Sequence, residues 1–131
     1  MSHHREELRV EGLAEPISHY TDAVKSRGLL FVSGIVPVDG DGKLVGEGDV
    51  VEQTRQVFRV MERVLAAGGC SAAEVSKVTV YLLDIADRAR INPVRQEFFG
   101  AARPASTLVE ISRLPVPGAR VEVEAVALLP S

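Results

Sequence analysis

The chain has 131 residues, of which 46% are hydrophobic and 25% are charged, and its formal net charge is −3. A chain of this length is expected to form one domain, residues 1–131, whose core needs neither disulfides nor a structural metal. The negative charge leaves no basic stripe for a nucleic-acid backbone, and the longest apolar runs fall far short of the roughly 20 residues of a membrane-spanning helix, so neither partner is expected.

The first third of the chain predicts a lead-in followed by a β-hairpin. Residues 1–15 are polar and acidic, which predicts a loosely ordered or edge-strand lead-in. Residues 21–25 and 29–33 both favour strands, and residues 26–28 join them. Gly28 can supply the positive φ that a tight hairpin turn often needs.

Residues 49–67 have the pattern of an amphipathic helix. Asp49 is placed to cap the first turn, with Glu52 three residues later, and two glycines follow the last apolar position. The apolar side chains recur at steps of three and four residues, which is the spacing of one helix face. They are Val50, Val57, Phe58, Met61, Val64 and Leu65.

The middle of the chain predicts a strand and a second helix. Residues 71–74 repeat the capping spacing Ser-x-x-Glu and predict one helical turn. Residues 75–83 alternate and are rich in strand-favouring types. Residues 87–99 predict a helix that is interrupted or started at Asn92-Pro93, because asparagine suits an N-cap and proline suits the first helical position.

The last quarter of the chain predicts two strands. Residues 103–110 and 121–127 alternate with period two, and the second run places Glu122 and Glu124 on one face. The order is therefore β-β-α-β-α-β-β, an α+β fold with two helices packed on one face of a sheet. Residues 29–32 and 128–129 put apolar groups on both sides of their strands, so the second face is expected to be buried in a homo-oligomer.

Metal, nucleotide and disulfide sites are not expected. Cys70 is the single cysteine and follows two glycines, so it is interpreted as a small packing residue. The histidines His3, His4 and His19 lack the carboxylate spacing of a zinc site. The run that begins at Asp39 resembles the start of a calcium loop but lacks later ligands, and is predicted to be a turn. No cofactor is expected, and the lack of an apolar signal segment predicts a cytoplasmic protein.

Several separate motifs carry a further signal. They are Ser18-His19-Tyr20, Val32-Ser33-Gly34 with Pro37, residues 84–92, Glu97-Phe98-Phe99 and residues 103–127. Together they are similar to the reactive-intermediate deaminase family (Rid, or YjgF), whose members hydrolyse enamines and imines. The resemblance covers roughly residues 16–128. It implies a chorismate-mutase-like α+β subunit, a homotrimer and clefts between neighbouring subunits that take a small-molecule substrate.

By this resemblance, Tyr20, Ser33, Asn92 and Glu122 match positions that line the family's cleft. Glu122 is similar to the carboxylate that positions the attacking water, a task that needs an acceptor with a pKa near the working pH. Glu124 offers a way to tune it, because two nearby carboxylates resist ionising together. The alternative is that both glutamates are solvated strand residues.

The other candidates also have structural alternatives. Tyr20 either contacts the substrate or is an ordinary half-buried tyrosine. Asn92 either lines the cleft or only caps a helix, and Ser33 either holds a water or belongs to a turn. His19 is a candidate acid or base, because its unperturbed pKa of about 6.5 suits proton transfer near neutrality, or it is a surface residue.

Ser106 departs from the family pattern. The resemblance implies an arginine at this position, which grips a substrate carboxylate through a bidentate pair that a serine hydroxyl cannot reproduce. Small α-imino acids such as 2-aminoacrylate are therefore not the expected substrate. Arg103 is a candidate replacement, with Arg88 and Arg90 as others, and Thr107 is a further candidate for substrate binding.

Two functions follow from these observations. The first is hydrolytic deamination of an enamine or imine, such as a 2-aminomuconate-like compound, by a positioned water and a proton relay. The second is a non-enzymatic trimer that binds a small metabolite or a partner in the same cleft, because a shared fold does not guarantee chemistry. The acidic balance argues against the ribonuclease activity proposed for some relatives.

Overall fold

The computed structural model describes residues 5–131; residues 1–4, which include His3 and His4, lie outside the described residues. Helices and strands follow the expected order, with a short first strand in the lead-in. They are β1 (Glu6–Leu8), β2 (Ala23–Ser26), β3 (Leu29–Ile35), α1 (Val50–Ala67), the 3-10 turn η1 (Ala72–Glu74), β4 (Val75–Leu82), α2 (Asp87–Phe99), β5 (Ala105–Glu110) and β6 (Val121–Leu128).

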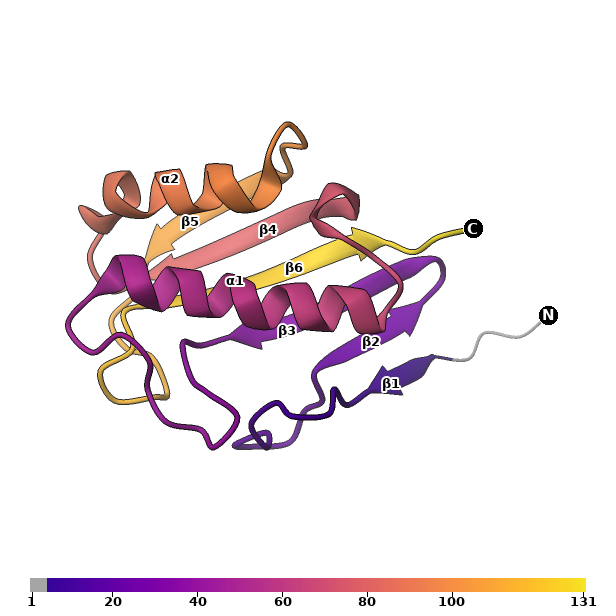
Figure 1. Ribbon diagram of the computed structural model, residues 1–131, viewed down its shortest axis with the longest axis horizontal. Helices are drawn as coiled ribbons and strands as arrows, with labels where there is room; N and C mark the ends of the chain where they lie inside the picture. Colours follow the sequence, from indigo (N-terminus) through magenta and orange to yellow (C-terminus); the bar gives the residue numbers. More distant parts are fainter. Residues whose placement is uncertain (1–4) are drawn as a thin grey trace.

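The strands form one six-stranded mixed sheet in the order β1-β2-β3-β6-β4-β5. All neighbours pair antiparallel except β4 and β5, which are parallel and are joined through α2. Both helices cover the same face of this sheet (Figure 1). The expected α+β architecture is therefore confirmed, and β6, the last strand in the chain, lies between β3 and β4.

The predicted hairpin and first helix are confirmed, because both rest on local signals. Arg27 and Gly28 have φ values of 50° and 79°, the two consecutive left-handed residues of a tight hairpin turn. The Asp49 side chain accepts hydrogen bonds from the backbone N–H groups of Val51 and Glu52 and so caps α1. Beyond the helix, Gly69 has a φ of 84°, as a helix end often requires.

The second helix has the predicted bounds, but the predicted interruption or start at Asn92-Pro93 is wrong. It runs without a break from Asp87 to Phe99 and contains Pro93, so Asn92 is exposed on the helix surface and does not cap it. Asp84 precedes the helix and accepts from the N–H of Ala86, and no side chain caps the first turn of the helix itself. The interior proline removes one helical hydrogen bond, a loss that burial of neighbouring apolar groups against the sheet offsets.

A buried ion pair fixes the start of this helix. Asp87 is 1% exposed, and Arg120, just before β6, donates to its carboxylate at 2.7 Å. Arg90 lies 3.5 Å from the other carboxylate oxygen. A buried carboxylate needs such partners because its charge has left water. The pair ties the chain segments before β6 to the beginning of α2.

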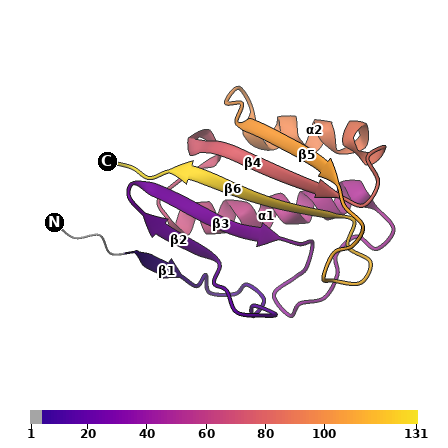
Figure 2. The same ribbon diagram turned by 180° about the vertical axis from the view of Figure 1, so that it is seen from behind.

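The uncovered face of the sheet carries both carboxylates and apolar side chains. In β6 the alternate residues Val121, Val123, Ala125 and Ala127 are buried beneath the helices, so Glu122 and Glu124 point to the opposite side. Neither α1 nor α2, the two α-helices of the described residues, lies over that side (Figure 2). Its exposed apolar groups include Phe31, 44% exposed, and Leu128, 56% exposed. We call this side the open face.

The rejected motifs have structural roles. Asp39 accepts hydrogen bonds from the N–H groups of Asp41 and Lys43, which confirms a turn. Cys70 is 7% exposed and its thiol donates to the carbonyl of Leu128, which confirms a packing role. Within residues 5–131, no helix is both long and apolar enough to cross a membrane.

Candidate functional site

A cavity of about 360 Å³ lies at one end of the open face. It forms where the neighbouring strands β3 and β6 meet two loops, one before β2 and one before β6. Three of the residues expected at the site from the sequence, Tyr20, Ser33 and Glu122, line it together. The complete lining is Ile17, Ser18, Tyr20, Ser33, Gly34, Val36, Pro115 and Glu122.

Glu122 is the acidic group of this cavity. Its side chain lies directly over Gly34, where an added Cβ would come within 2.0 Å of the carboxylate Oε2. The pairing of β3 with β6 is irregular between Val32 and Ile35, and Gly34 falls within this irregular stretch. Among residues 5–131, Glu122 has no hydrogen-bond or ion-pair partner, so its carboxyl group is available to a ligand or a water.

The surroundings of Glu122 favour its protonated form. Burial raises the pKa of its carboxyl group, and the neighbouring charge of Glu124 raises it further. Glu124 itself accepts a hydrogen bond of 2.5 Å from the hydroxyl of Tyr81 on β4. A carboxyl whose pKa is raised in a cavity is suited to exchange protons nearer neutral pH.

The polar neighbours of Glu122 in the cavity are Tyr20 and Ser33. Tyr20 is 46% exposed, and its hydroxyl accepts a hydrogen bond from the N–H of Ile17. The Ser33 hydroxyl donates its proton to the carbonyl of Thr21 at 2.6 Å, and its oxygen lone pairs can still accept a hydrogen bond. His19 is exposed and does not line this cavity.

A second group of candidate residues lies at the outer edge of the sheet, between α2 and β5. The Arg95 guanidinium on α2 donates a hydrogen bond of 2.8 Å to the hydroxyl of Ser106 on β5. Burial lowers the pKa of Arg95, yet no carboxylate of the described residues pairs with it. Asn92 lies one helical turn before Arg95 and is exposed. We call Asn92, Arg95 and Ser106 the edge group.

Sequence reasoning missed Arg95 and named other arginines. Arg88, Arg90 and Arg103 are all exposed, and Arg90 is paired with Asp87. The signal that would have found Arg95 is its spacing, three residues after Asn92 on the same helix. Its reach to Ser106 depends on how α2 packs over the sheet, which the spacing does not give.

Within one chain, the cavity of Glu122 and the edge group lie on different parts of the sheet. Ser106 pairs with Val78, which is fully buried under the helices, so Ser106 lies on the helix side of β5. Glu122 pairs with Tyr81 on the open face, and β4 separates the two strands. Thr107 has the opposite orientation to Ser106, and the ammonium of Lys77 donates to it.

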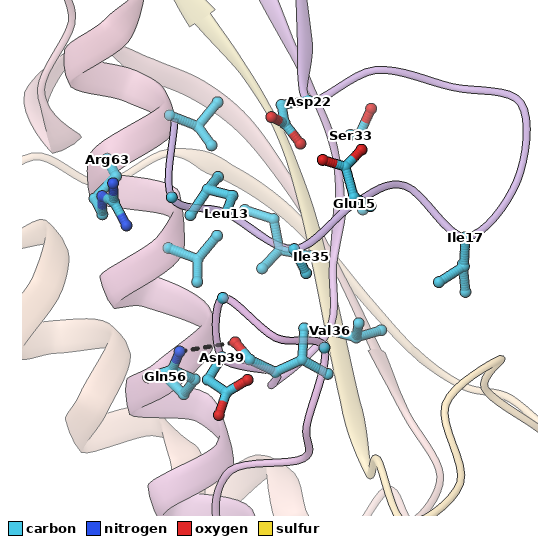
Figure 3. Close-up of a pocket in the computed structure, with 18 of the residues that line it drawn as sticks. Leu13, Glu15, Ile17, Asp22, Ser33, Ile35, Val36, Asp39, Gln56 and Arg63 are labelled. Carbon is cyan, nitrogen blue, oxygen red and sulfur yellow. Dashed lines mark hydrogen bonds between the residues drawn. The ribbon is translucent and has the colours of Figure 1, made fainter. Parts of the chain in front are cut away.

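An adjoining cavity, of about 310 Å³, shares Tyr20, Ser33 and Gly34 with the first and lies between α1 and two loops (Figure 3). Gln56 and Arg63 reach it from α1, and Leu13 and Ile35 supply apolar walls. These two polar side chains from α1 are engaged by the protein, because Gln56 donates to the carbonyl of Val38 and Arg63 to that of Glu11. The cavity of Glu122 is therefore the better candidate for chemistry.

Comparison with known proteins identifies the family. The family model described as "Endoribonuclease L-PSP" matches residues 12–129. The chain belongs to this family, that of the Rid (YjgF) proteins. A RutC family protein of Pyrococcus horikoshii is 41% identical over 94% of this chain and 97% of its own length. The "3-aminoacrylate deaminase RutC" of Acinetobacter baylyi is 35% identical over 94% of this chain and 97% of its own length.

A solved structure supports the same assignment. The conserved Rid family protein YyfA of Yersinia pestis superposes with a TM-score of 0.90 at 30% identity, over 96% of this chain and 100% of that one. The Rid fold, with two helices on a mixed six-stranded sheet, is thus the fold of this chain. At the level of the Rid family, the named relatives support deamination of enamines and imines.

Proposed function

We propose that this Rid protein hydrolyses an enamine or imine to a carbonyl compound and ammonia, in a cleft between the subunits of a homotrimer. The observation that carries the proposal is the carboxyl of Glu122, which has no partner among residues 5–131 and whose pKa is raised, in a cavity that also holds Tyr20 and Ser33. The activity in the name of a relative 35% identical to the chain gives further support.

The reaction needs proton transfer and positioning. An enamine first takes a proton on carbon to become a protonated imine. Water then adds to the C=N carbon and loses a proton, the nitrogen gains a proton, and the hydroxyl loses its remaining proton as the C–N bond breaks to give a C=O group and ammonia. Ionised Glu122 can take the proton of the attacking water and then return it to the leaving nitrogen. Tyr20 can orient the substrate through its hydroxyl or its ring.

A neighbouring subunit would complete the cleft with the edge group. The open face carries exposed apolar side chains, such as Phe31 and Leu128, that a second copy of the chain can bury. A closed ring of three copies would apply the edge of one sheet to the open face of the next, a heterologous contact. Glu122 and Arg95 would then come from different subunits.

The edge group also bears on the substrate. Ser106 lacks the charge to bind a carboxylate, but Arg95 places a half-buried cation against its hydroxyl, with no acidic partner in the described chain. An anionic group of the substrate would satisfy this cation. We therefore propose that the substrate is an enamine or imine that bears a carboxylate. We rank 2-aminomuconate above 2-aminoacrylate as the substrate, because the guanidinium projects from α2 and not from β5, where the family resemblance implies an arginine at position 106.

The test is ammonia release from freshly generated 2-aminoacrylate and from 2-aminomuconate. Glu122→Gln is expected to lower kcat by at least about 100-fold, because general acid–base catalysis contributes on that order. Glu47→Gln changes an exposed loop carboxylate outside the cavity and serves as the matched control. Absence of turnover on both substrates by the wild-type protein, with a ligand retained in the cleft, would instead support the non-enzymatic binding function.

A further inference from the structure

The open face contains a three-residue hydrogen-bonded and charged cluster beside the candidate site. Tyr81 on β4 stands directly opposite Glu122 in the register of β4 and β6. Its hydroxyl turns to the next carboxylate on the strand and donates to Glu124 Oε1 at 2.5 Å. Glu124 and Glu122 are two residues apart on one strand face, so the two carboxyl groups are close neighbours.

The hydroxyl of Tyr81 donates a hydrogen bond to only one of the two carboxylates. A hydrogen bond donated to a carboxylate stabilises its charged form, and Glu124 receives one while Glu122 receives none among residues 5–131. The pKa of Tyr81 is raised to about 12, chiefly by this bond, so the phenol remains a donor across the working pH range. When the pair holds a single proton, that proton is therefore favoured on Glu122.

Other groups on the open face do not reverse this preference. Lys77 on β4 is the cation nearest in sequence register, and its ammonium donates to Thr107 on the far side from Glu122. Strand β3, which packs on the other side of β6, carries no charged residue. The loop before β2 contributes Tyr20, whose hydroxyl accepts from a backbone N–H.

We propose that Tyr81 is a positioning residue that assigns the proton shared by the Glu122–Glu124 carboxyl pair to Glu122. Tyr81 does not line the cavity, and it acts through Glu124. Under the proposed function, on which its catalytic meaning rests, this places the exchangeable proton on the one carboxyl that faces the substrate.

The experiment is a carboxyl-carbon NMR titration of the full chain with labelled glutamate, which needs no substrate. In the wild-type protein, Glu122 is expected to titrate above the ordinary range of a glutamate. Tyr81→Phe removes the hydrogen bond that favours the charged form of its neighbour, so less of the shared proton stays on Glu122, and the Glu122 midpoint is expected to fall by up to about one pH unit, the size of a lost charge-assisted hydrogen bond. Thr79→Val removes a hydroxyl on the same face of β4 and is expected to leave the Glu122 midpoint unchanged.

A Glu122 titration that is the same in Tyr81→Phe and Thr79→Val would overturn the proposal. If Tyr81→Phe does not fold, Glu124→Gln tests the same coupling from the other side. Removing the neighbouring carboxylate is expected to lower the Glu122 midpoint, and an unchanged midpoint contradicts the proposal. Because these titrations are read from the carboxyl groups themselves, failure of the deaminase assay would leave their result intact.

Discussion

The carboxylate of Glu122 occupies the space above Gly34 that any other residue would fill with its side chain. An ideal Cβ at position 34 would lie 2.0 Å from Glu122 Oε2 and 2.9 Å from its Cδ. Because heavy atoms do not approach so closely, the glycine sets where the carboxyl group can rest. The position of the Glu122 carboxyl group thus depends on Gly34 of β3 as well as on the backbone of β6.

Gly34→Ala is expected to displace the Glu122 side chain and to lower kcat/KM by about 100-fold, since a shift of about 1 Å in a reacting group has effects of that order. The rate of ammonia release measures it. A double-mutant cycle with Glu122→Gln supplies the control, because alanine at position 34 should have little further effect once the carboxylate is gone. Independent, additive losses would show that Gly34 acts elsewhere.

The raised pKa of Glu122 gives a pH-dependent stability. A carboxyl whose pKa is higher in the folded than in the unfolded protein binds its proton more tightly when folded, so ionisation lowers stability as pH rises through the interval between the two pKa values. Glu122→Gln should therefore raise Tm at pH 7, with the difference vanishing below the pKa of the unfolded chain. Thermal melts at pH 3 and pH 7 at equal protein concentration measure it. A Tm difference that is larger at the acid pH would contradict the assignment.

Arg95 is expected to set substrate affinity. Arg95→Ala should raise KM for an anionic substrate by about 10- to 100-fold, the size of a lost charge-assisted hydrogen bond, with a smaller effect on kcat. Arg88→Ala and Arg103→Ala test the arginines suggested by the sequence and should leave KM nearly unchanged. Equal effects of all three substitutions would indicate a general charge effect and remove Arg95 from the site.

The buried ion pair of Asp87 is expected to be important for folding. Arg120→Met leaves the carboxylate of Asp87 buried without its closest cation and should lower the free energy of unfolding by about 3 kcal/mol. Urea denaturation measures the change. Arg5→Met breaks an exposed pair with Glu7 and should change it by less than about 1 kcal/mol. Similar small losses in both variants would show that Arg90 alone suffices for Asp87.

Local signals in the sequence were enough to place most of the fold. The cap at Asp49, the positive-φ turn at Gly28 and the alternation around Glu122 each depend on residues a few positions apart. The bounds of α2 were predicted correctly, but the break or start expected within it at Asn92-Pro93 was wrong, for the opposite reason. Asn92-Pro93 has a strong local capping pattern, but Asp87 is fixed by Arg120, which is distant in sequence and becomes a neighbour only in the fold.

The candidate site was predictable in part for the same physical reasons. Tyr20, Ser33 and Glu122 were expected to lie near one another and do share a cavity, because β3 and β6 are neighbours in the sheet. Arg95 was not expected, since its contact with Ser106 depends on the packing of α2 over β5. The separation of Ser106 from Glu122 follows from the parallel pairing of β5 with β4, which alternation alone does not determine.

The most direct test of a cleft shared between subunits is complementation between two impaired variants. Glu122→Gln and Arg95→Ala are expressed separately and then together, and ammonia release is measured on the purified mixed assembly. Random mixing in a closed trimer, with each site taking Glu122 from one subunit and Arg95 from the next, should restore about a quarter of the sites to wild-type composition. Activity near that level supports the account. Coexpressed protein no more active than the separate variants would contradict it.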